Sequence, residues 1–271
     1  MGIFQVLKGV RGERVFRTAT MGVLAFLTLF FITLVVAMVV YSDWDTLIST
    51  LISEEILFAV KLSLITATIA TIISVIIAIP TAYAISQAEF PGKNIVDTIL
   101  DLPIVISPIA LGAALLVFFN TAIGKGMENH VIRFVFEVPG IILAQFTVIS
   151  ALAVRLLKST FDSIDPRYEQ VGRTLGCSKL KVFFRVTLPL ARDGLIASTI
   201  LAWAKAMGEF GATVTLAGAT PFKTETLPIA IFLSLATADV EKAVAVIFIL
   251  IIIATLGLIA LRKISGKNYQ I

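Results

Sequence analysis

Long apolar segments constrain this chain more than any other feature, because about 20 mainly apolar residues can cross the hydrocarbon core of a bilayer. Six segments have the required length: about 20–41, 56–86, 103–122, 139–157, 194–217 and 243–261. The first is long enough to stay as a membrane span rather than act as a cleaved signal peptide. A further apolar run at 227–236 is too short to cross. We therefore predict an all-α integral membrane protein with six transmembrane helices.

Lysine and arginine are unevenly distributed over the loops between these segments. Sixteen of these residues lie in alternate segments, at 1–19, around Lys93, at 155–192 and at 262–267, whereas the intervening loops hold four. Loops rich in lysine and arginine stay in the cytoplasm, so we predict that both termini and the loop between the fourth and fifth helices are cytoplasmic. The predicted parts are a basic arm (1–19), a first span with its outer loop (20–55), a five-span core (56–262) containing a cytoplasmic loop (165–189), and a tail (263–271).

The polar stretch at 165–189 is too polar to lie in lipid, and it is patterned rather than irregular. Apolar residues recur at spacings of four and seven, which predicts a short amphipathic helix over about 166–182. Asp165 followed by Pro166 is typical of a helix start. Two glycines share the apolar face and would let a partner approach the backbone closely. The residues of this face are Val171, Gly172, Leu175, Gly176 and Val182.

Catalytic machinery is not indicated anywhere in the chain. Cys177 is the only cysteine and His130 the only histidine, which excludes an intramolecular disulfide and disfavours a histidine-based metal site or catalytic triad. The glycine–lysine pairs lack the spacing of a phosphate-binding loop. We therefore expect no catalytic residue, no metal or other cofactor bound by this chain, and no nucleic-acid partner. An energised function would need a partner that supplies the energy.

Two apolar segments carry features of a solute path. Pro103 and Pro108 predict a distorted third helix, and backbone groups freed inside a membrane must meet protein or water. Lys205 and Glu209 lie four residues apart in the fifth segment, where charges either pair or face water. They could hold helices in register or line a path for a charged solute, and both interpretations stay open. The path candidates are Pro108, Lys205 and Glu209, with Thr213 and Thr215 as hydrogen-bond donors to an anion.

The stretch at 165–189 resembles the cytoplasmic "EAA" loop of ABC importer permeases of the type I, MetI-like class. That loop has a glycine, nine residues, and then Ile-x-Leu-Pro. Here Gly176 precedes nine residues and then Val186-Thr187-Leu188-Pro189. The Glu-Ala-Ala positions hold Gln170-Val171-Gly172, so Gln replaces the glutamate and Glu169 lies one residue earlier. This departure places in question any role that needs a carboxylate at position 170.

Within that class, the chain is similar to the molybdate/tungstate permeases over about 56–262. The residues that carry this similarity are Arg173-Thr174-Leu175-Gly176, Thr187-Leu188-Pro189-Leu190 and Gly208-Glu209-Phe210-Gly211-Ala212-Thr213. Sulfate/thiosulfate permeases share much of the pattern. The resemblance implies import of a tetrahedral oxyanion, most simply molybdate or tungstate, with sulfate or thiosulfate as the alternative. A channel or secondary anion carrier is an alternative of another class, although a proton-coupled carrier would be expected to hold more carboxylates than Glu209 inside its spans.

The resemblance also implies the partners. These are a second copy of this chain, two cytoplasmic ATPase subunits that bind ATP and Mg, an external solute-binding protein, and the bilayer of a prokaryotic plasma membrane. The chain itself would not be an enzyme. The predicted cytoplasmic helix would dock in a groove of the ATPase and drive alternating access. The implied coupling residues are Glu169, Gln170, Val171, Gly172, Arg173, Leu175, Gly176, Cys177 and Lys179.

Overall fold

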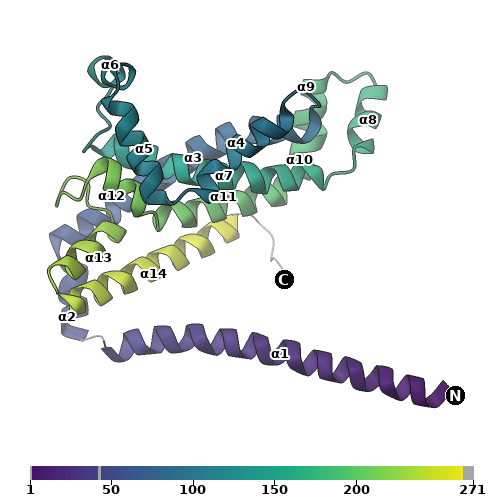
Figure 1. Ribbon diagram of the computed structural model, residues 1–271, viewed down its shortest axis with the longest axis horizontal. Helices are drawn as coiled ribbons and strands as arrows, with labels where there is room; N and C mark the ends of the chain where they lie inside the picture. Colours follow the sequence, from purple (N-terminus) through teal and green to yellow (C-terminus); the bar gives the residue numbers. More distant parts are fainter. Residues whose placement is uncertain (1, 42–43, 265–271) are drawn as a thin grey trace.

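The computed structural model describes residues 2–41 and 44–264, which are almost entirely helical, with no strand among them (Figure 1). The predicted tail (263–271) beyond residue 264 and most side chains of the predicted basic arm lie outside the described part. The first half of the chain contains α1 (Gly2–Tyr41), α2 (Trp44–Ile52), α3 (Glu54–Gln87), α4 (Lys93–Val105), α5 (Pro108–Asn120), α6 (Ala122–His130) and α7 (Val138–Asp162). The second half contains α8 (Arg167–Thr174), α9 (Lys179–Val182), a π-helix η1 (Phe183–Thr187), α10 (Leu188–Leu190), α11 (Arg192–Met207), α12 (Gly211–Ala217), α13 (Leu227–Ala236) and α14 (Val240–Ile264).

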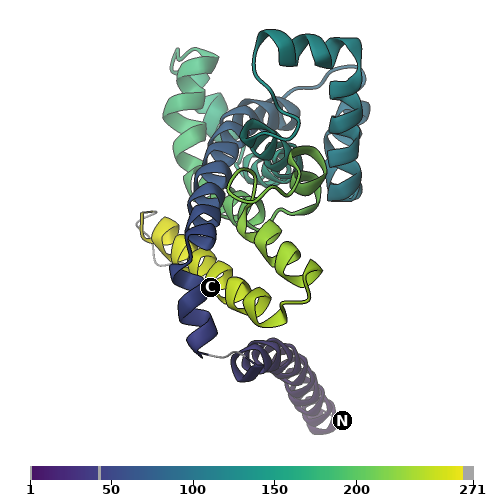
Figure 2. The ribbon, with the colours of Figure 1, turned by 90° about the vertical axis from the view of Figure 1, so that its left-hand side faces the viewer.

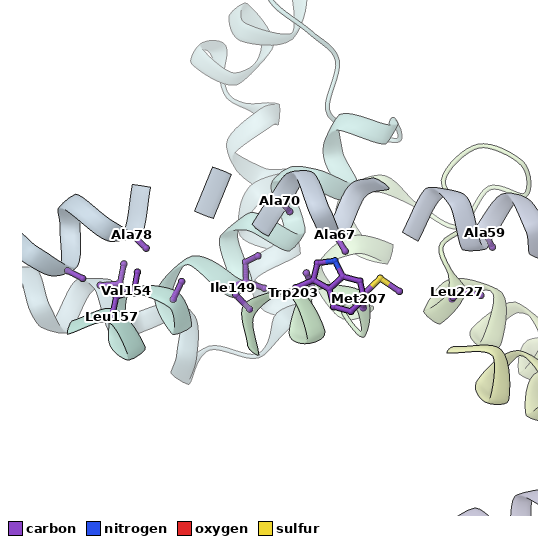
Figure 3. Packing of buried hydrophobic residues seen from close by; sticks show 14 of the residues in the cluster. Ala59, Ala67, Ala70, Ala78, Ile149, Val154, Leu157, Trp203, Met207 and Leu227 are labelled. Atoms are coloured by element: carbon purple, nitrogen blue, oxygen red, sulfur yellow. The ribbon is translucent and has the colours of Figure 1, made fainter. Parts of the chain in front are cut away.

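The core of the bundle is formed by α3 and α7, which pack along each other, with α11 against both. The inner face of α3 consists largely of small residues, including Ala67, Ala70 and Ala78, which lets the helices approach closely. Figure 3 shows Ala67 and Ala70 near Trp203 of α11 and Ile149 of α7, and Ala78 near Val154 and Leu157 of α7. The Trp203 indole donates a hydrogen bond to Thr68 Oγ1 at 3.2 Å. The small side chains of α3 therefore make room for large ones on its neighbours.

Four helical segments are long and apolar enough to cross a membrane: Val15–Tyr41, Glu54–Gln87, Val138–Asp162 and Val240–Ala260. The predicted third span at 103–122 contains α5 and only the end of α4; these two helices form a bent pair that would make a fifth span if it counts as one. The predicted fifth span at 194–217 is divided into α11, of 16 residues, and α12, of 7 residues. The short run predicted not to cross is α13, of 10 residues. The count of six spans therefore stays a prediction.

The helix α1 stands apart from the rest of the bundle (Figure 2). The predicted basic arm and first span are one continuous helix, without a break near residue 20. Its described apolar side chains, such as Phe26 and Leu29, are exposed. In a bilayer these side chains would contact lipid or another protein chain.

The predicted distortion of the third segment is confirmed, and it is a sharp break rather than a kink. The axes of α4 and α5 meet at 111°. Pro108 disfavours the helical conformation at the preceding Ser107, whose ψ of 145° is extended. The Ser107 hydroxyl then accepts from the Ala110 amide at 3.3 Å and caps α5. The proline thus ends one helix and begins the next.

The prediction of one helix over 166–182 is wrong beyond Leu175. The helix α8 ends at Thr174, and Gly176 has a φ of +81°, a left-handed conformation that favours glycine. The Cys177 amide bonds to the Gly172 carbonyl at 3.1 Å and the Gly176 amide to the Arg173 carbonyl at 3.0 Å. This pair of bonds is the Schellman motif that terminates helices. Gly176 therefore stops the helix, and the chain starts again at α9.

Candidate functional site

The two breaks in the membrane helices lie against each other. A Cβ atom on Gly211, at the start of α12, would lie 3.0 Å from Pro108 Cβ and from the Ile109 amide nitrogen at the start of α5. One turn along α5, a Cβ on Gly112 would lie 2.7 Å from the Ala212 carbonyl oxygen. The two helices thus touch backbone to backbone, which only glycine allows here. The structure therefore brings together Pro108 and the segment around Glu209, the two regions proposed from sequence for the path.

Glu209 lies inside the second break and is 2% exposed. Its Oε1 accepts a hydrogen bond from the Ala212 amide at 3.0 Å, in the first turn of α12. A carboxylate is stabilised there by the unpaired amides and the positive end of the helix. Lys205 is exposed, and the described residues contain no Lys205–Glu209 ion pair. The interpretation of these two residues as a structural ion pair is therefore wrong.

The two threonines of the predicted path differ in whether their hydroxyl groups already donate a hydrogen bond within the chain. Thr215 Oγ1 already donates to the Gly211 carbonyl at 2.7 Å. Thr213 is fully buried, and its hydroxyl has no hydrogen-bond partner in the described part of the chain. Of the two, Thr213 is thus the threonine with a hydroxyl still free to donate.

Gln145 of α7 is a polar residue at this site that was not among the predicted path residues. Its Nε2 donates to the Ala206 carbonyl at 3.2 Å, in the last turn of α11 before the break. Its Oε1 is buried and has no hydrogen-bond partner among the described residues. The same carbonyl accepts from the Glu209 amide at 3.1 Å, so Gln145 is a second donor to the backbone at this break. An amide in the middle of the apolar segment 139–157 was the available signal.

The loop between α7 and α11 projects from one end of the bundle, whereas α6 projects from the other (Figure 1). Its outer surface carries exposed apolar side chains between basic ones. We call it the docking face, defined by Tyr168, Val171, Arg173, Leu175, Lys179 and Leu180. Gly172 instead faces inward, where its Cβ would lie 3.0 Å from a methyl of the buried Val182. The predicted apolar face is therefore divided between an outer and an inner surface.

The other predicted coupling residues also divide between these surfaces. Gln170 and Gly176 are exposed, and Cys177 is half-buried. The half-buried Glu169 points toward the bundle, where its carboxylate accepts hydrogen bonds from Tyr83 and Thr187. The sequence resemblance gave no indication of this difference between Glu169 and Gln170.

A third polar group lies at the far end of the bundle from the docking face. Lys242, at the start of α14, pairs with Glu55, at the start of α3, at 2.8 Å. The neighbouring Glu225, in the connection before α13, is fully buried. Burial, together with the negative charge of Glu55, raises the pKa of Glu225 to about 7, although Lys242 opposes the shift.

Comparison with known proteins gives this arrangement a context. Residues 74–267 match the family described as "Binding-protein-dependent transport system inner membrane component". The molybdenum transport system permease protein ModB of Escherichia coli K12 is 36% identical over 69% of this chain and 83% of its own length. The molybdate/tungstate transport system permease protein WtpB of Pyrococcus furiosus is 36% identical over 65% of this chain and 66% of its own. The sulfate transport system permease protein CysW of Synechocystis is 31% identical over 74% of each chain.

The fold has a close counterpart among solved structures. A chain of a bacterial ABC transporter that imports the acidic polysaccharide alginate superimposes with a TM-score of 0.78, covering 98% of this chain and 100% of its own, at 16% sequence identity. At that identity the likeness concerns the fold alone. Together, the fold and the match over residues 74–267 establish that the chain belongs to the inner membrane components, or permeases, of binding-protein-dependent ABC transport systems.

Proposed function

We propose that this chain is the permease subunit of an ATP-driven importer of a tetrahedral oxyanion, with molybdate and tungstate as its substrates. The observation that carries this proposal is the 36% identity with both ModB and WtpB, whose names describe molybdenum and molybdate/tungstate transport. The chain itself is not an enzyme, because in this family the ATPase is a separate subunit.

The docking face supports a cytoplasmic ATPase as the partner. Val171 is 57% exposed and Leu175 is 78% exposed, on a loop too polar to lie in lipid. Apolar side chains held in water at the tip of a loop are typical of a protein interface. Arg173 and Lys179 flank them, and positive loops stay in the cytoplasm. We therefore propose that the loop lies on the cytoplasmic side and, with the six spans predicted from the sequence, that both chain termini lie there too.

The breaks support assembly of two copies of this chain. Ser107, Lys205 and Gly208 are all exposed in the single chain, beside the two helix breaks. Irregular backbone and a lysine at membrane depth cannot face lipid, because no water satisfies them there. This surface must be covered by protein or line a water-filled path. A second copy, related by a two-fold axis, would enclose it.

The same surface supports an anion path between the two copies. The exposed Lys205 is a donor suited to an oxyanion, and the α12 amide offsets the charge of Glu209. The Thr213 hydroxyl is buried, so it would reach an anion only after a movement that exposes it. Polar groups at the interface of membrane repeats, beside broken helices, are typical of transporter sites. ATP-driven movement of the docking face would then tilt the helices that carry the breaks, a rigid-body form of alternating access.

Sulfate is the second candidate substrate, favoured by the 31% identity with CysW. The test is to purify the chain with its ATPase and to measure ATP hydrolysis on addition of a binding protein loaded with molybdate, tungstate or sulfate. The proposal predicts a stable complex whose hydrolysis rises with the molybdate- or tungstate-loaded protein. A rise with sulfate alone would change the substrate, and the absence of a complex would refute the proposal.

A further inference from the structure

We propose that Glu169 is an internal tether that couples movement of the docking face to the membrane helices, rather than a contact to the ATPase. This inference rests on the proposed function and adds to it a positioning residue for transport. It concerns a carboxylate that the motif resemblance grouped with the docking residues. Its side chain turns away from the docking face, into the joint between the cytoplasmic loop and the bundle.

The joint is made by one carboxylate and two hydroxyl groups from distant parts of the chain. The Tyr83 hydroxyl, near the end of α3, donates to Glu169 at 3.3 Å. Thr187 is the last residue of η1 and is 1% exposed. Its Oγ1 donates to the same carboxylate at 2.5 Å. Hydrogen bonds to an ionised acceptor are among the stronger ones in proteins. The carboxylate thus links α8 both to α3 and to η1.

Aromatic packing fixes the position of the tyrosine. The Tyr83 ring lies 4.7 Å, centroid to centroid, from Phe183 of η1 and 5.7 Å from Phe161 of α7. Removal of the hydroxyl would leave this packing in place. The hydroxyl therefore contributes to the joint separately from the ring.

Without the tether, α8 would be weakly connected to the bundle. It has eight residues, and an isolated helix of that length is not stable in water. Non-helical segments lie on both sides of it, at 163–166 and 175–178. The buried Gly172 also brings α8 close to Val182 and Val186. Among these contacts, only that of Glu169 reaches α3, through a side-chain hydrogen bond. A push on the docking face could rotate α8 without moving α3, unless Glu169 holds it.

The two roles occupy different sides of the same helix. Glu169 and Gly172, three residues apart, turn inward, whereas Gln170 and Val171 are exposed. From Thr187 the chain continues through α10 into α11, which ends at the break that contains Glu209. Force applied to the docking face therefore has a continuous route, through Glu169, to the helix that bears the proposed path.

The π-helix lies at the centre of this route. Residues Phe183–Thr187 form a five-residue π turn between α9 and α10. π-helical turns are rare in proteins overall, and those that occur are often found at functional sites. Here the turn carries both the phenylalanine that packs on Tyr83 and the threonine that bonds to Glu169. The π-helix η1 thus connects α8, through the hydrogen bond from Thr187 to Glu169, to the chain that leads into α11.

The test uses the full complex of the permease with its ATPase, reconstituted in vesicles with the binding protein. The variants are Glu169→Ala and the pair Tyr83→Phe with Thr187→Val, which removes both hydroxyl donors but keeps the side-chain shapes. We expect each to retain ATPase co-purification but to lower the ratio of binding-protein-stimulated to basal ATP hydrolysis at least about fivefold. Glu89→Gln removes an 89% exposed carboxylate near the end of α3 and should leave this ratio unchanged.

Combining the variants separates a shared joint from independent effects. If the three side chains act as one unit, the triple variant should show no further loss beyond Glu169→Ala. Loss of ATPase co-purification in Glu169→Ala would overturn the tether in favour of a contact role. A normal hydrolysis ratio in the double hydroxyl variant would overturn it as well. The absence of stimulation in the unmodified complex would instead refute the proposed function, before any variant is compared.

Discussion

Replacement of Glu225 by glutamine should stabilise the protein at alkaline pH. The carboxyl group is fully buried, beside the ion pair of Glu55 with Lys242. Burial and the charge of Glu55 raise its pKa from 4.5 to about 7. Between these two values the folded protein holds a proton that the unfolded chain has released. The Glu225 contribution to stability is therefore complete below about pH 4.5 and is lost as the pH rises through about 7.

The size of this effect follows from the two pKa values. A difference of one pKa unit corresponds to about 1.4 kcal/mol, so the full loss is about 3 kcal/mol. Glutamine has nearly the shape of the protonated acid and carries no charge at any pH. We therefore expect Glu225→Gln to exceed the free energy of unfolding of the unmodified protein by less than about 1 kcal/mol at pH 5 and by about 3 kcal/mol at pH 8.5.

The assay is thermal unfolding of the detergent-purified protein, with and without the substitution, at intervals from pH 5 to pH 9. Glu137→Gln is the control, because Glu137 pairs with the half-exposed Lys223 in the same predicted outer region. This substitution removes a carboxylate that is not buried, so it should not reproduce the gain in stability that Glu225→Gln shows at high pH. A Glu225→Gln profile parallel to that of the unmodified protein would refute the reasoning, as would a variant less stable at pH 8.5.

Three further predictions test the breaks and the docking face. Gly112→Ala places a methyl 2.7 Å from the Ala212 carbonyl, so the melting temperature should fall with a loss of about 1–3 kcal/mol; an unchanged melting temperature would contradict the contact. Glu209→Gln keeps an acceptor for the amide of α12 but removes the charge, so vesicle uptake should fall at least about fivefold while the yield of folded protein is maintained; loss of yield alone would assign Glu209 a structural role. Leu175→Asp, at a side chain 78% exposed, should weaken ATPase binding by about 2 kcal/mol or more in a titration without lowering the permease melting temperature, and unchanged binding would remove Leu175 from the interface.

Sequence reasoning works best here where the signal is local. Long apolar runs predicted α3, α7 and α14, because burial in a bilayer requires length and composition alone. Pro108 predicted a distorted helix, because a proline acts on the residue just before it. The spacing from Gly176 to Pro189 indicated the family because it is a short pattern that lies within a single loop.

The features that sequence reasoning missed depend on distant partners. The break after Met207 lies inside the predicted fifth span, whose length suggested one helix, and Gln145 from another helix donates to the carbonyl of Ala206 beside the break. The inward position of Glu169 depends on Tyr83, which lies 86 residues earlier. The end of α8 is different, because Gly176 after Leu175 is a recognisable helix stop. There the apolar spacing, which continued to Val182, suggested a longer helix than the backbone conformation of glycine allows.

Uptake of molybdate into vesicles that contain the purified permease and its ATPase tests the central claim most directly. With ATP on the ATPase side and the binding protein on the other, the account predicts that molybdate accumulates against its gradient. It also predicts that accumulation stops when either ATP or the binding protein is omitted. Accumulation or equilibration of molybdate without both would identify a carrier or channel and contradict the account.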